Sequence, residues 1–218
     1  MNKKILIITS CSLRHFYFAK TILNAFQKNV IKIILEGKIE SKYKYKLNQE
    51  KDNLLLDHFN MRYNSELDFF SDSLDLLNKK PKILNIKKGE INDKKIVKNI
   101  TSLKPDLIIT YGCSIIRSNL LKLYKKRIIN VHLGISPYYK GAGTNFHSLV
   151  NKEFQFMGYS FIYMDEGIDT GEIIHQCRAD FFPFDNPHTI GNRLIKRMSH
   201  DIIKLITHFD LISEKIII

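Results

Sequence analysis

The sequence predicts an α/β fold in which helices cover both faces of an open, mostly parallel, Rossmann-like sheet. Three observations predict this fold class. Short, dense runs of Ile, Leu and Val recur along the chain as far as His132, stretches of helical length separate them, and no internal repeat is present. Alternation of this kind is typical of parallel strands that are joined by right-handed crossovers and covered by helices on both sides.

The first part of the predicted sheet contains three strands. Apolar runs at residues 4–9 (KILIIT), 30–35 (VIKIIL) and 82–86 predict them. An amphipathic stretch predicts a helix over residues 14–27, and a second helix is expected over residues 60–78. The segment between residues 37 and 53 is polar and rich in lysine, so we expect it to be solvated surface.

The second part of the chain begins with two more dense strands, at residues 106–110 (DLIIT) and 127–132 (RIINVH), with a helix expected between them over residues 115–125. The pattern then changes to a loop that contains several glycines, a short helix from Thr144, and strands around residues 158–163 and 172–179. A last helix is expected over residues 188–206, because Asn186 and Pro187 precede a periodic run. We expect residues 1–218 to form a single domain whose ligands bind beyond the carboxyl ends of the parallel strands.

Composition argues against several classes of protein. A hydrophobic share of 44% and a charged share of 26% are ordinary for globular proteins, which argues against disorder. Cys11, Cys113 and Cys177 form no CxxC pair, so we expect neither a disulfide framework nor a cysteine-rich zinc site. The sequence has no run of about 18 apolar residues and no signal-peptide pattern, so we expect a cytoplasmic protein that does not enter the membrane.

The net charge of +12 would attract phosphates, polyglutamate tails or nucleic acid. Charge alone does not choose among these ligands. Heavy use of Lys, Asn and Ile along the whole chain explains the charge equally well as a compositional bias.

Polar residues at the end of one strand and in one loop are the candidate chemical centre. Asn130 and His132 are two residues apart in the strand at 127–132, so both side chains lie on the same face, where buried polar groups require hydrogen-bond partners. Asp165 and Asp169 belong to a loop with two glycines, MDEGIDTG. Each feature also has a structural explanation, because a strand can end in solvent and Asp is common in turns.

The two features together resemble the folate-dependent formyltransferase family. The segment NVHLGISPYYKGAGTNF, followed at this separation by MDEGIDTG, matches the family motif at Asn130, His132, Pro137, Lys140, Gly141 and the triplet Asp169-Thr170-Gly171. The resemblance covers roughly residues 105–174. Lys140 stands where the family often has Arg. The lysine keeps the positive charge but lacks the planar guanidinium that can donate two parallel hydrogen bonds.

The resemblance implies that an amine attacks the formyl carbon of N10-formyltetrahydrofolate, which acts as the co-substrate. Asn130 would then donate a hydrogen bond to the developing oxyanion. His132 would add a second donor and deliver a proton to the leaving nitrogen, and Asp169 would favour the charged imidazole and accept the proton of the amine. This chemistry requires no metal ion, and none is expected.

The resemblance also implies two sets of binding residues. The pterin is expected to contact the segments around Tyr111, Gly112, Cys113, Ile115 and Ile116 and around Asp165, Glu166, Gly167 and Ile168. Residues expected near the acceptor are Ser12, Arg14, His15, Lys140 and Gly141. A Ser followed by Arg and His at the start of a helix suits an anion or a sugar hydroxyl, although such residues are also common helix caps.

The choice of acceptor depends on what this sequence lacks relative to the family's branches. The loop after the first strand has no glycine, unlike the phosphate loop of glycinamide ribonucleotide formyltransferases, and we see no β-rich domain of the kind that methionyl-tRNA formyltransferases append. The segment SPYYKGAGTNF is most like the corresponding segment of amino-sugar formyltransferases of surface-polysaccharide synthesis. We therefore expect the amine of a nucleotide-linked amino sugar, with glycinamide ribonucleotide of purine synthesis as the alternative.

A hypothesis from another class is a basic module that binds nucleic acid, with Tyr43 and Tyr45 interleaved among lysines. Aromatic residues between cations are typical of such surfaces, but the formyltransferase interpretation leads us to expect no nucleic-acid partner. The surface of the final strands would be available for a homodimer.

Overall fold

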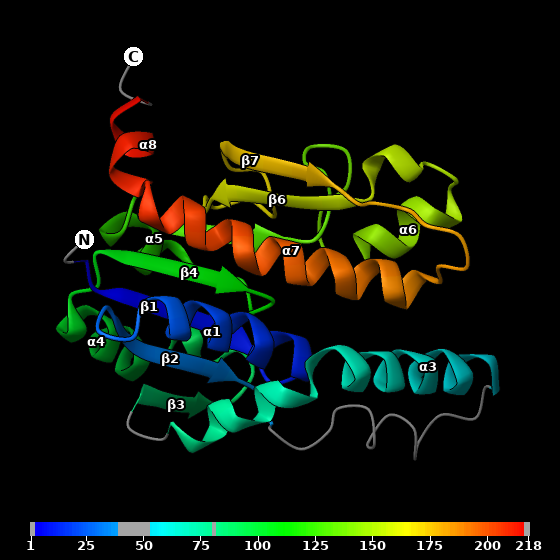
Figure 1. Ribbon diagram of the computed structural model, residues 1–218. Coiled ribbons are helices and arrows are strands. Elements are labelled where there is room, and N and C mark those ends of the chain that lie inside the picture. The colour runs from blue at the N-terminus through cyan, green and yellow to red at the C-terminus, as the bar shows by residue number, and fades with distance from the viewer. Residues whose placement is uncertain (1–2, 39–52, 80–81, 216–218) are drawn as a thin grey trace.

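The structure is a computed structural model that describes residues 3–38, 53–79 and 82–215. Its centre is a seven-stranded sheet in the order β3-β2-β1-β4-β5-β6-β7 (Figure 1). The strands are β1 (Ile5–Ser10), β2 (Val30–Glu36), β3 (Ile83–Ile86), β4 (Leu107–Tyr111), β5 (Ile128–His132), β6 (Gly158–Tyr163) and β7 (Ile173–Arg178). Strands β1 to β5 pair in parallel, whereas β6 and β7 pair antiparallel, so the predicted fold class is confirmed.

Helices cover both faces of this sheet. They are α1 (Leu13–Ala25), α3 (Asn53–Phe70), α4 (Lys94–Leu103), α5 (Ser118–Leu123), α6 (Thr144–Val150), α7 (Pro187–Thr207) and α8 (Phe209–Lys215). Side chains of α1 and α7 share one hydrophobic cluster with the sheet, and side chains of α4 and α5 share another. Figure 1 shows α1 and α7 together on the near face.

The strand β1 shows why two clusters form. Its side chains are fully buried and alternate between the faces, as the period of two in a strand requires. Ile5 and Ile7 belong to the cluster with α1 and α7, whereas Leu6 and Ile8 belong to the cluster with α4 and α5. A continuous apolar run is therefore the expected pattern for a strand with helices on both sides.

Three helix predictions need correction. The helix expected over residues 60–78 begins earlier, at Asn53, and its last part, Ser71–Asn78, is a 3-10 helix. The helices α4 and α8 were not predicted. The first of these could have been inferred, because parallel strands such as β3 and β4 require a crossover between them and a helix usually provides it.

The start of α7 agrees closely with the sequence pattern. Asn186 caps the helix: its Oδ1 accepts hydrogen bonds from the backbone N–H groups of His188 and Thr189, at 2.9 and 3.0 Å. The Thr189 hydroxyl in turn accepts from the backbone N–H of Asn186, which completes a capping box. Pro187 occupies the first helical position, where its missing N–H has no cost.

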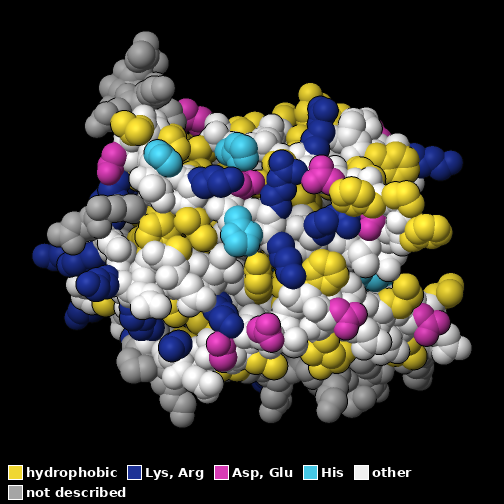
Figure 2. Space-filling model, viewed as in Figure 1, with side chains coloured by type: hydrophobic (Ala, Val, Ile, Leu, Met, Phe, Trp, Pro, Cys, Tyr) yellow, Lys and Arg dark blue, Asp and Glu magenta, His cyan; other side chains and the backbone are white. Residues whose placement is uncertain are grey.

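Charge is dispersed on the face shown in Figure 2, where Lys and Arg side chains are interspersed with acidic and hydrophobic ones. Within the described part of the chain, none of the helices is both long and apolar enough to cross a membrane. Tyr43 and Tyr45, on which the nucleic-acid hypothesis depends, lie outside the described residues.

Candidate active site

A cavity of about 790 Å³ lies beyond the carboxyl ends of β1, β4 and β5. The order of the parallel strands reverses between β1 and β4, because β2 and β3 lie on one side of β1 and the later strands on the other. Such a switch point is where ligands bind in open α/β sheets. The volume lies in the range of about 300–1,000 Å³ that is usual for ligand sites.

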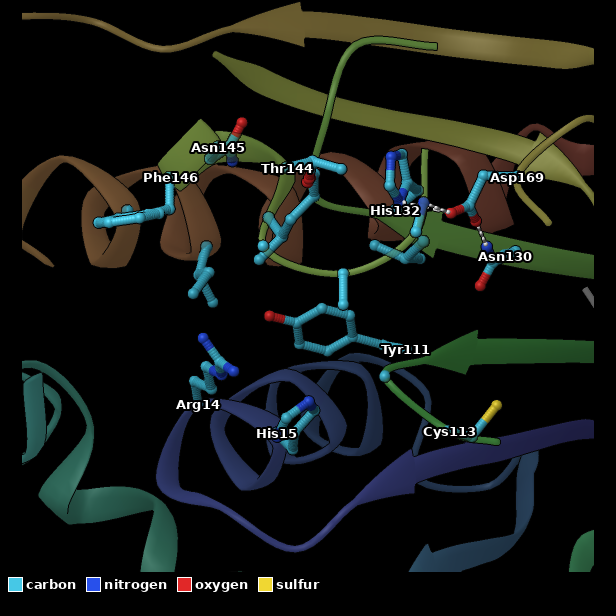
Figure 3. Close-up of a pocket in the computed structure, with 18 of the residues that line it drawn as sticks. Arg14, His15, Tyr111, Cys113, Asn130, His132, Thr144, Asn145, Phe146 and Asp169 are labelled. Carbon is cyan, nitrogen blue, oxygen red and sulfur yellow. Dashed lines mark hydrogen bonds and ion pairs between the residues drawn. The ribbon is translucent and has the colours of Figure 1, made fainter. Parts of the chain in front are cut away.

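Three polar side chains meet at one end of this cavity (Figure 3). Asn130 and His132 lie side by side at the end of β5, and Asp169 reaches them from the loop between β6 and β7. Asn130 Nδ2 donates a hydrogen bond of 2.7 Å to Asp169 Oδ1, and His132 Nδ1 lies 3.1 Å from Asp169 Oδ2. The backbone N–H of Gly141 donates to the same Oδ2 at 2.8 Å. The carboxylate therefore receives donors from three directions.

Asp169 and Thr110 together hold the Asn130 amide in place. The Thr110 hydroxyl donates to Asn130 Oδ1 at 3.0 Å from the neighbouring strand β4. Exchange of the two amide atoms would set Oδ1 against the Asp169 carboxylate, which only accepts, whereas the Thr110 hydroxyl could accept from Nδ2; the carboxylate therefore selects the orientation and Thr110 supports it. Sequence reasoning did not single out Thr110, since a Thr in a buried strand has no distinctive signal.

Both ring nitrogens of His132 face acceptor oxygens. Nδ1 faces the Asp169 carboxylate, and Nε2 lies 2.9 Å from the carbonyl oxygen of Tyr139. A nitrogen forms a hydrogen bond with either acceptor only when it carries a hydrogen, so the imidazolium form satisfies both contacts at once. A ligand that accepts a hydrogen bond from Nε2 must therefore replace the Tyr139 carbonyl.

Hydrogen bonds and a close backbone approach restrict the conformation of the loop that carries Asp169. Asp169 itself has a φ of 52°, in the left-handed region that Asp tolerates better than most residues. Asp165 Oδ1 accepts from the Gly167 backbone N–H at 3.0 Å and from the Thr170 hydroxyl at 2.8 Å. A Cβ at Gly171 would lie 1.7 Å from the Tyr163 carbonyl oxygen, so only glycine fits there. Asp165 thus shapes the turn, while Asp169 faces the cavity.

The loop after β4 approaches α1 closely. Gly112 has a φ of 65°, and a Cβ there would lie 2.4 Å from His15 Nε2. The His15 ring packs against Tyr111 with centroids 4.6 Å apart, and its Nδ1 lies 2.5 Å from Ser12 Oγ. Glycine at position 112 therefore allows the cavity wall to pack directly on the start of α1.

A buried carboxylate holds the next part of this wall. Glu36, at the end of β2, accepts backbone hydrogen bonds from Ser114 at 2.5 Å and from Gly89 at 2.8 Å. Burial, followed by the nearby Glu36 charge, raises the pKa of the Cys113 thiol to about 12. Cys113 therefore stays protonated at neutral pH and is not suited to act as a nucleophile.

The structure brings most of the predicted site residues to the cavity. Its lining includes Arg14, His15, Tyr111, Gly112, Cys113, Ile115, Ile116, Asn130, His132, Gly141, Asp165, Gly167, Ile168 and Asp169. The predicted residues Ser12, Lys140 and Glu166 are not part of this lining. Ser12 contacts His15 instead, and the side chains of Lys140 and Glu166 are exposed.

The end of the cavity away from Asp169 is lined by side chains that sequence reasoning missed. They are His58, Arg62 and Glu66 of α3, Phe146 of α6, and His188 and Asn192 of α7. One signal was available: the three residues of α3 are spaced four apart and so share one face of the helix. Nothing in the sequence indicated that α3 and α7 both reach the end of the sheet where β5 ends.

Comparison with known proteins identifies the family. A family model described as formyl transferase matches residues 60–206, which is more than half of the chain and includes Asn130, His132 and Asp169. The chain belongs to the formyl transferase family. The resemblance noted in the sequence is thereby confirmed at the level of the family.

Curated relatives of this formyl transferase match it over only part of their own length. The methionyl-tRNA formyltransferase of Thermodesulfovibrio yellowstonii is 31% identical over 107 residues, which are 48% of this chain and 34% of that protein. The chain thus spans about a third of the length of the curated relatives it matches.

Solved structures of two formyltransferases are similar as well. Phosphoribosylglycinamide formyltransferase from Anaplasma phagocytophilum has a TM-score of 0.71 at 14% identity, covering 99% of this chain and 89% of that one; this likeness concerns the fold. PseJ from Anoxybacillus kamchatkensis, in complex with UDP-4,6-dideoxy-4-formamido-L-AltNAc and tetrahydrofolate, has a TM-score of 0.51 at 26% identity. That match covers 83% of this chain and 77% of PseJ.

Proposed function

We propose that this formyl transferase moves a formyl group from N10-formyltetrahydrofolate to a primary amine of a nucleotide-linked amino sugar, with residues 1–218 acting as one catalytic domain. One observation carries the proposal: the Asp169 carboxylate is held between Asn130 and His132 at the end of a ligand-sized cavity. The family match supports the reaction class, and the likeness to PseJ, whose complex holds both a nucleotide-linked sugar and tetrahydrofolate, supports the two substrates.

The proposed reaction makes one bond and breaks one. The donor supplies the formyl carbon; a bond forms between this carbon and the amine nitrogen, and the bond from the carbon to N10 breaks. One proton must pass from the amine to N10. The site must therefore accept a proton, return one, and stabilise negative charge on the formyl oxygen.

Asn130 is suited to stabilise the oxygen. Its amide has two N–H donors, and the contact with Asp169 uses one of them. The second would donate to the formyl oxygen, and because Asp169 and Thr110 already hold the amide in place, no reorganisation is needed when charge develops. A preorganised donor of this kind contributes about 3 kcal/mol to transition-state stabilisation.

Asp169 and His132 are suited to move the proton. The carboxylate would accept it from the attacking amine, directly or through water. The imidazolium would deliver a proton to N10 from Nε2, once the ligand has replaced the carbonyl of Tyr139. These steps use two side chains, Asp169 and His132, that already contact each other.

The residues beside Asp169 fit a flat, polar heterocycle such as the pterin of the donor. Ile115, Ile116, Met164 and Ile168 line the cavity there and provide apolar surface. The loops at residues 111–116 and 164–169 add backbone N–H and C=O groups, which can form hydrogen bonds with the polar edge of a ring. We propose that these two loops hold the donor.

Substitution in the chemical centre tests the reaction. Asn130→Ala and Asp169→Asn are each expected to lower kcat by about a hundredfold or more, with little change in the KM for the donor, because both groups act mainly on the transition state. Formation of tetrahydrofolate in steady-state kinetics measures this. The exposed residues Asn119 and Asp180 provide matched controls, and Asn119→Ala and Asp180→Asn should leave kcat unchanged. Wild-type kcat in both site variants would reject the mechanism.

A panel of amines tests the acceptor. Purified protein is incubated with the donor and with UDP- or dTDP-linked amino sugars, glycinamide ribonucleotide or methionyl-tRNA, and formylated product is detected by mass spectrometry. We expect product from a nucleotide-linked amino sugar. Product from glycinamide ribonucleotide or methionyl-tRNA alone would retain the reaction class and reject the proposed acceptor.

A further inference from the structure

Differently charged side chains line the two ends of the cavity. Asp165 and Asp169 lie at the end with the chemical centre, whereas Arg14 and Arg62 lie at the other end, and Figure 3 shows Tyr111 between Arg14 and the Asp169 group. Among the described lining residues, these two arginines are the side chains with a permanent positive charge. A ligand that fits this polarity carries an amine at one end and an anionic group at the other.

The two arginines are held by one buried carboxylate. Glu66 is 1% exposed, and its Oε1 lies 3.1 Å from Arg62 Nε and 3.8 Å from Arg14 Nε. Both guanidinium groups therefore lie beside the same carboxylate. The arrangement joins α1 to α3 and holds both planar cations at the cavity wall, and guanidinium is the group best suited to phosphate oxygens.

Aromatic rings stand next to this charge. The His58 ring lies 4.9 Å from the His188 ring and 5.8 Å from the Phe146 ring, measured between centroids, and all three residues line the cavity. Burial, together with His58 and Arg62, lowers the pKa of His188 to about 4, and burial and Arg62 also lower the pKa of His58. Both imidazoles are therefore neutral at pH 7 and offer flat faces and ring nitrogens for hydrogen bonds.

We infer that the α3–α7 end of the cavity binds the nucleoside diphosphate part of the acceptor, with Arg14 and Arg62 on the phosphates and the group formed by His58, His188 and Phe146 against the base. The inference rests on the proposed function for the identity of the acceptor. It places recognition of the nucleotide on α1, α3, α6 and α7, away from Lys140, which the sequence suggested. The amine of the same molecule then faces Asp169.

Calorimetric titration of the full chain with UDP and dTDP, without formyl donor, tests the subsite. We expect wild-type protein to bind at least one of the two, and Arg62→Gln to weaken that binding by about tenfold or more, because a charge-assisted contact is lost. Arg197→Gln is the matched control: Arg197 lies on α7 but pairs with Asp180 and Asp201 outside the cavity lining, and its loss should leave the affinity unchanged.

Two further variants separate the roles of the residues. Arg62→Lys keeps a cation beside buried Glu66, so it protects the fold and is expected to lose affinity less than Arg62→Gln. His58→Ala is expected to weaken binding of UDP or dTDP while leaving binding of inorganic pyrophosphate unchanged, because only the former ligands carry a base. Equal losses for nucleotide and pyrophosphate would contradict the role of the aromatic group.

The experiments test the proposed subsite and the proposed reaction independently. Absence of UDP and dTDP binding by the wild type, or wild-type affinity in Arg62→Gln, would overturn the subsite even if formyl transfer occurs. Specific nucleotide binding without formation of tetrahydrofolate in the presence of any amine would instead support the subsite and reject the proposed reaction.

Discussion

At the scale of the residue, the site depends on side chains whose hydrogen-bond partners leave them one orientation. Asp169 accepts from Asn130 and Gly141 and faces His132, and Asn130 accepts in turn from Thr110. Removal of one member leaves a buried polar atom without a partner, which costs about 1–3 kcal/mol. The geometry of the proposed catalytic group and the stability of the protein are therefore expected to be coupled at the end of β5.

Thr110 provides a test of this coupling. Thr110→Val keeps the shape and removes the hydroxyl, so Asn130 Oδ1 loses its donor and the amide can rotate. We expect kcat to fall by about tenfold and the free energy of unfolding to fall by about 1–3 kcal/mol. Thr110→Ser retains the hydroxyl and should recover most of the activity. Steady-state kinetics and urea unfolding measure the two effects; unchanged kcat in Thr110→Val would show that Asn130 needs no orienting group.

At the scale of the element, the loop between β6 and β7 decides where Asp169 lies. This loop bears acids and glycines that any turn contains, yet it brings a carboxylate to a strand far away in the sequence. Asp165 holds the turn from within, and Gly171 allows it to pass the Tyr163 carbonyl. The position of the Asp169 carboxylate therefore depends on the space available to the loop backbone.

Two glycines offer contrasting substitutions. Gly171→Ala would place a Cβ 1.7 Å from a backbone oxygen, so the loop must move and carry Asp169 with it. We expect activity to fall by about a hundredfold or more, since misplacement of about 1 Å has effects of that size. Gly191→Ala, in the interior of α7 with no atom within 4 Å of the new Cβ, should stabilise the protein by about 0.5–1 kcal/mol. Steady-state kinetics and urea unfolding of both variants test whether the room for a Cβ explains the different effects. Wild-type activity in Gly171→Ala would contradict this explanation.

At the scale of the whole molecule, one sheet brings together residues from distant parts of the chain. The switch point between β1 and β4 collects α1, the loop after β4 and the end of β5, and α3 and α7 then close the far end of the cavity. Net charge of +12 adds a general attraction for anions, while Arg14 and Arg62 locate positive charge within the cavity.

Stability of the whole molecule should depend on pH through His188. Its pKa is lowered from 6.5 to about 4 in the folded protein, where His58, Arg62 and Glu66 face it. The unfolded chain therefore binds more protons between these two values, so the free energy of unfolding falls as pH falls from about 6.5 to about 4. His188→Gln should make the urea midpoint less dependent on pH within this window and leave its value above pH 6.5 little changed. An equal pH dependence in both proteins would contradict the assignment.

Sequence by itself determined the fold class and the family resemblance, and it singled out Asn130, His132 and Asp169, which the structure brings into contact around the carboxylate. Dense apolar runs reveal buried strands because every residue of such a strand lies against a helix, as in β1, and Asn130 and His132 stand out because a period of two places them on one face. The helix α4 was missed even though the parallel pairing of the strands required a crossover.

Only the tertiary structure decided which side chains share the cavity with this centre. Thr110 contacts Asn130 across two strands, and the His58–Arg62–Glu66 face of α3 meets His188 of α7. Contacts of this kind join residues far apart in the sequence, and no local periodicity encodes them. Their positions follow from how the helices pack on the sheet, which is why the sequence did not indicate that Arg62 lines the cavity and Lys140 does not.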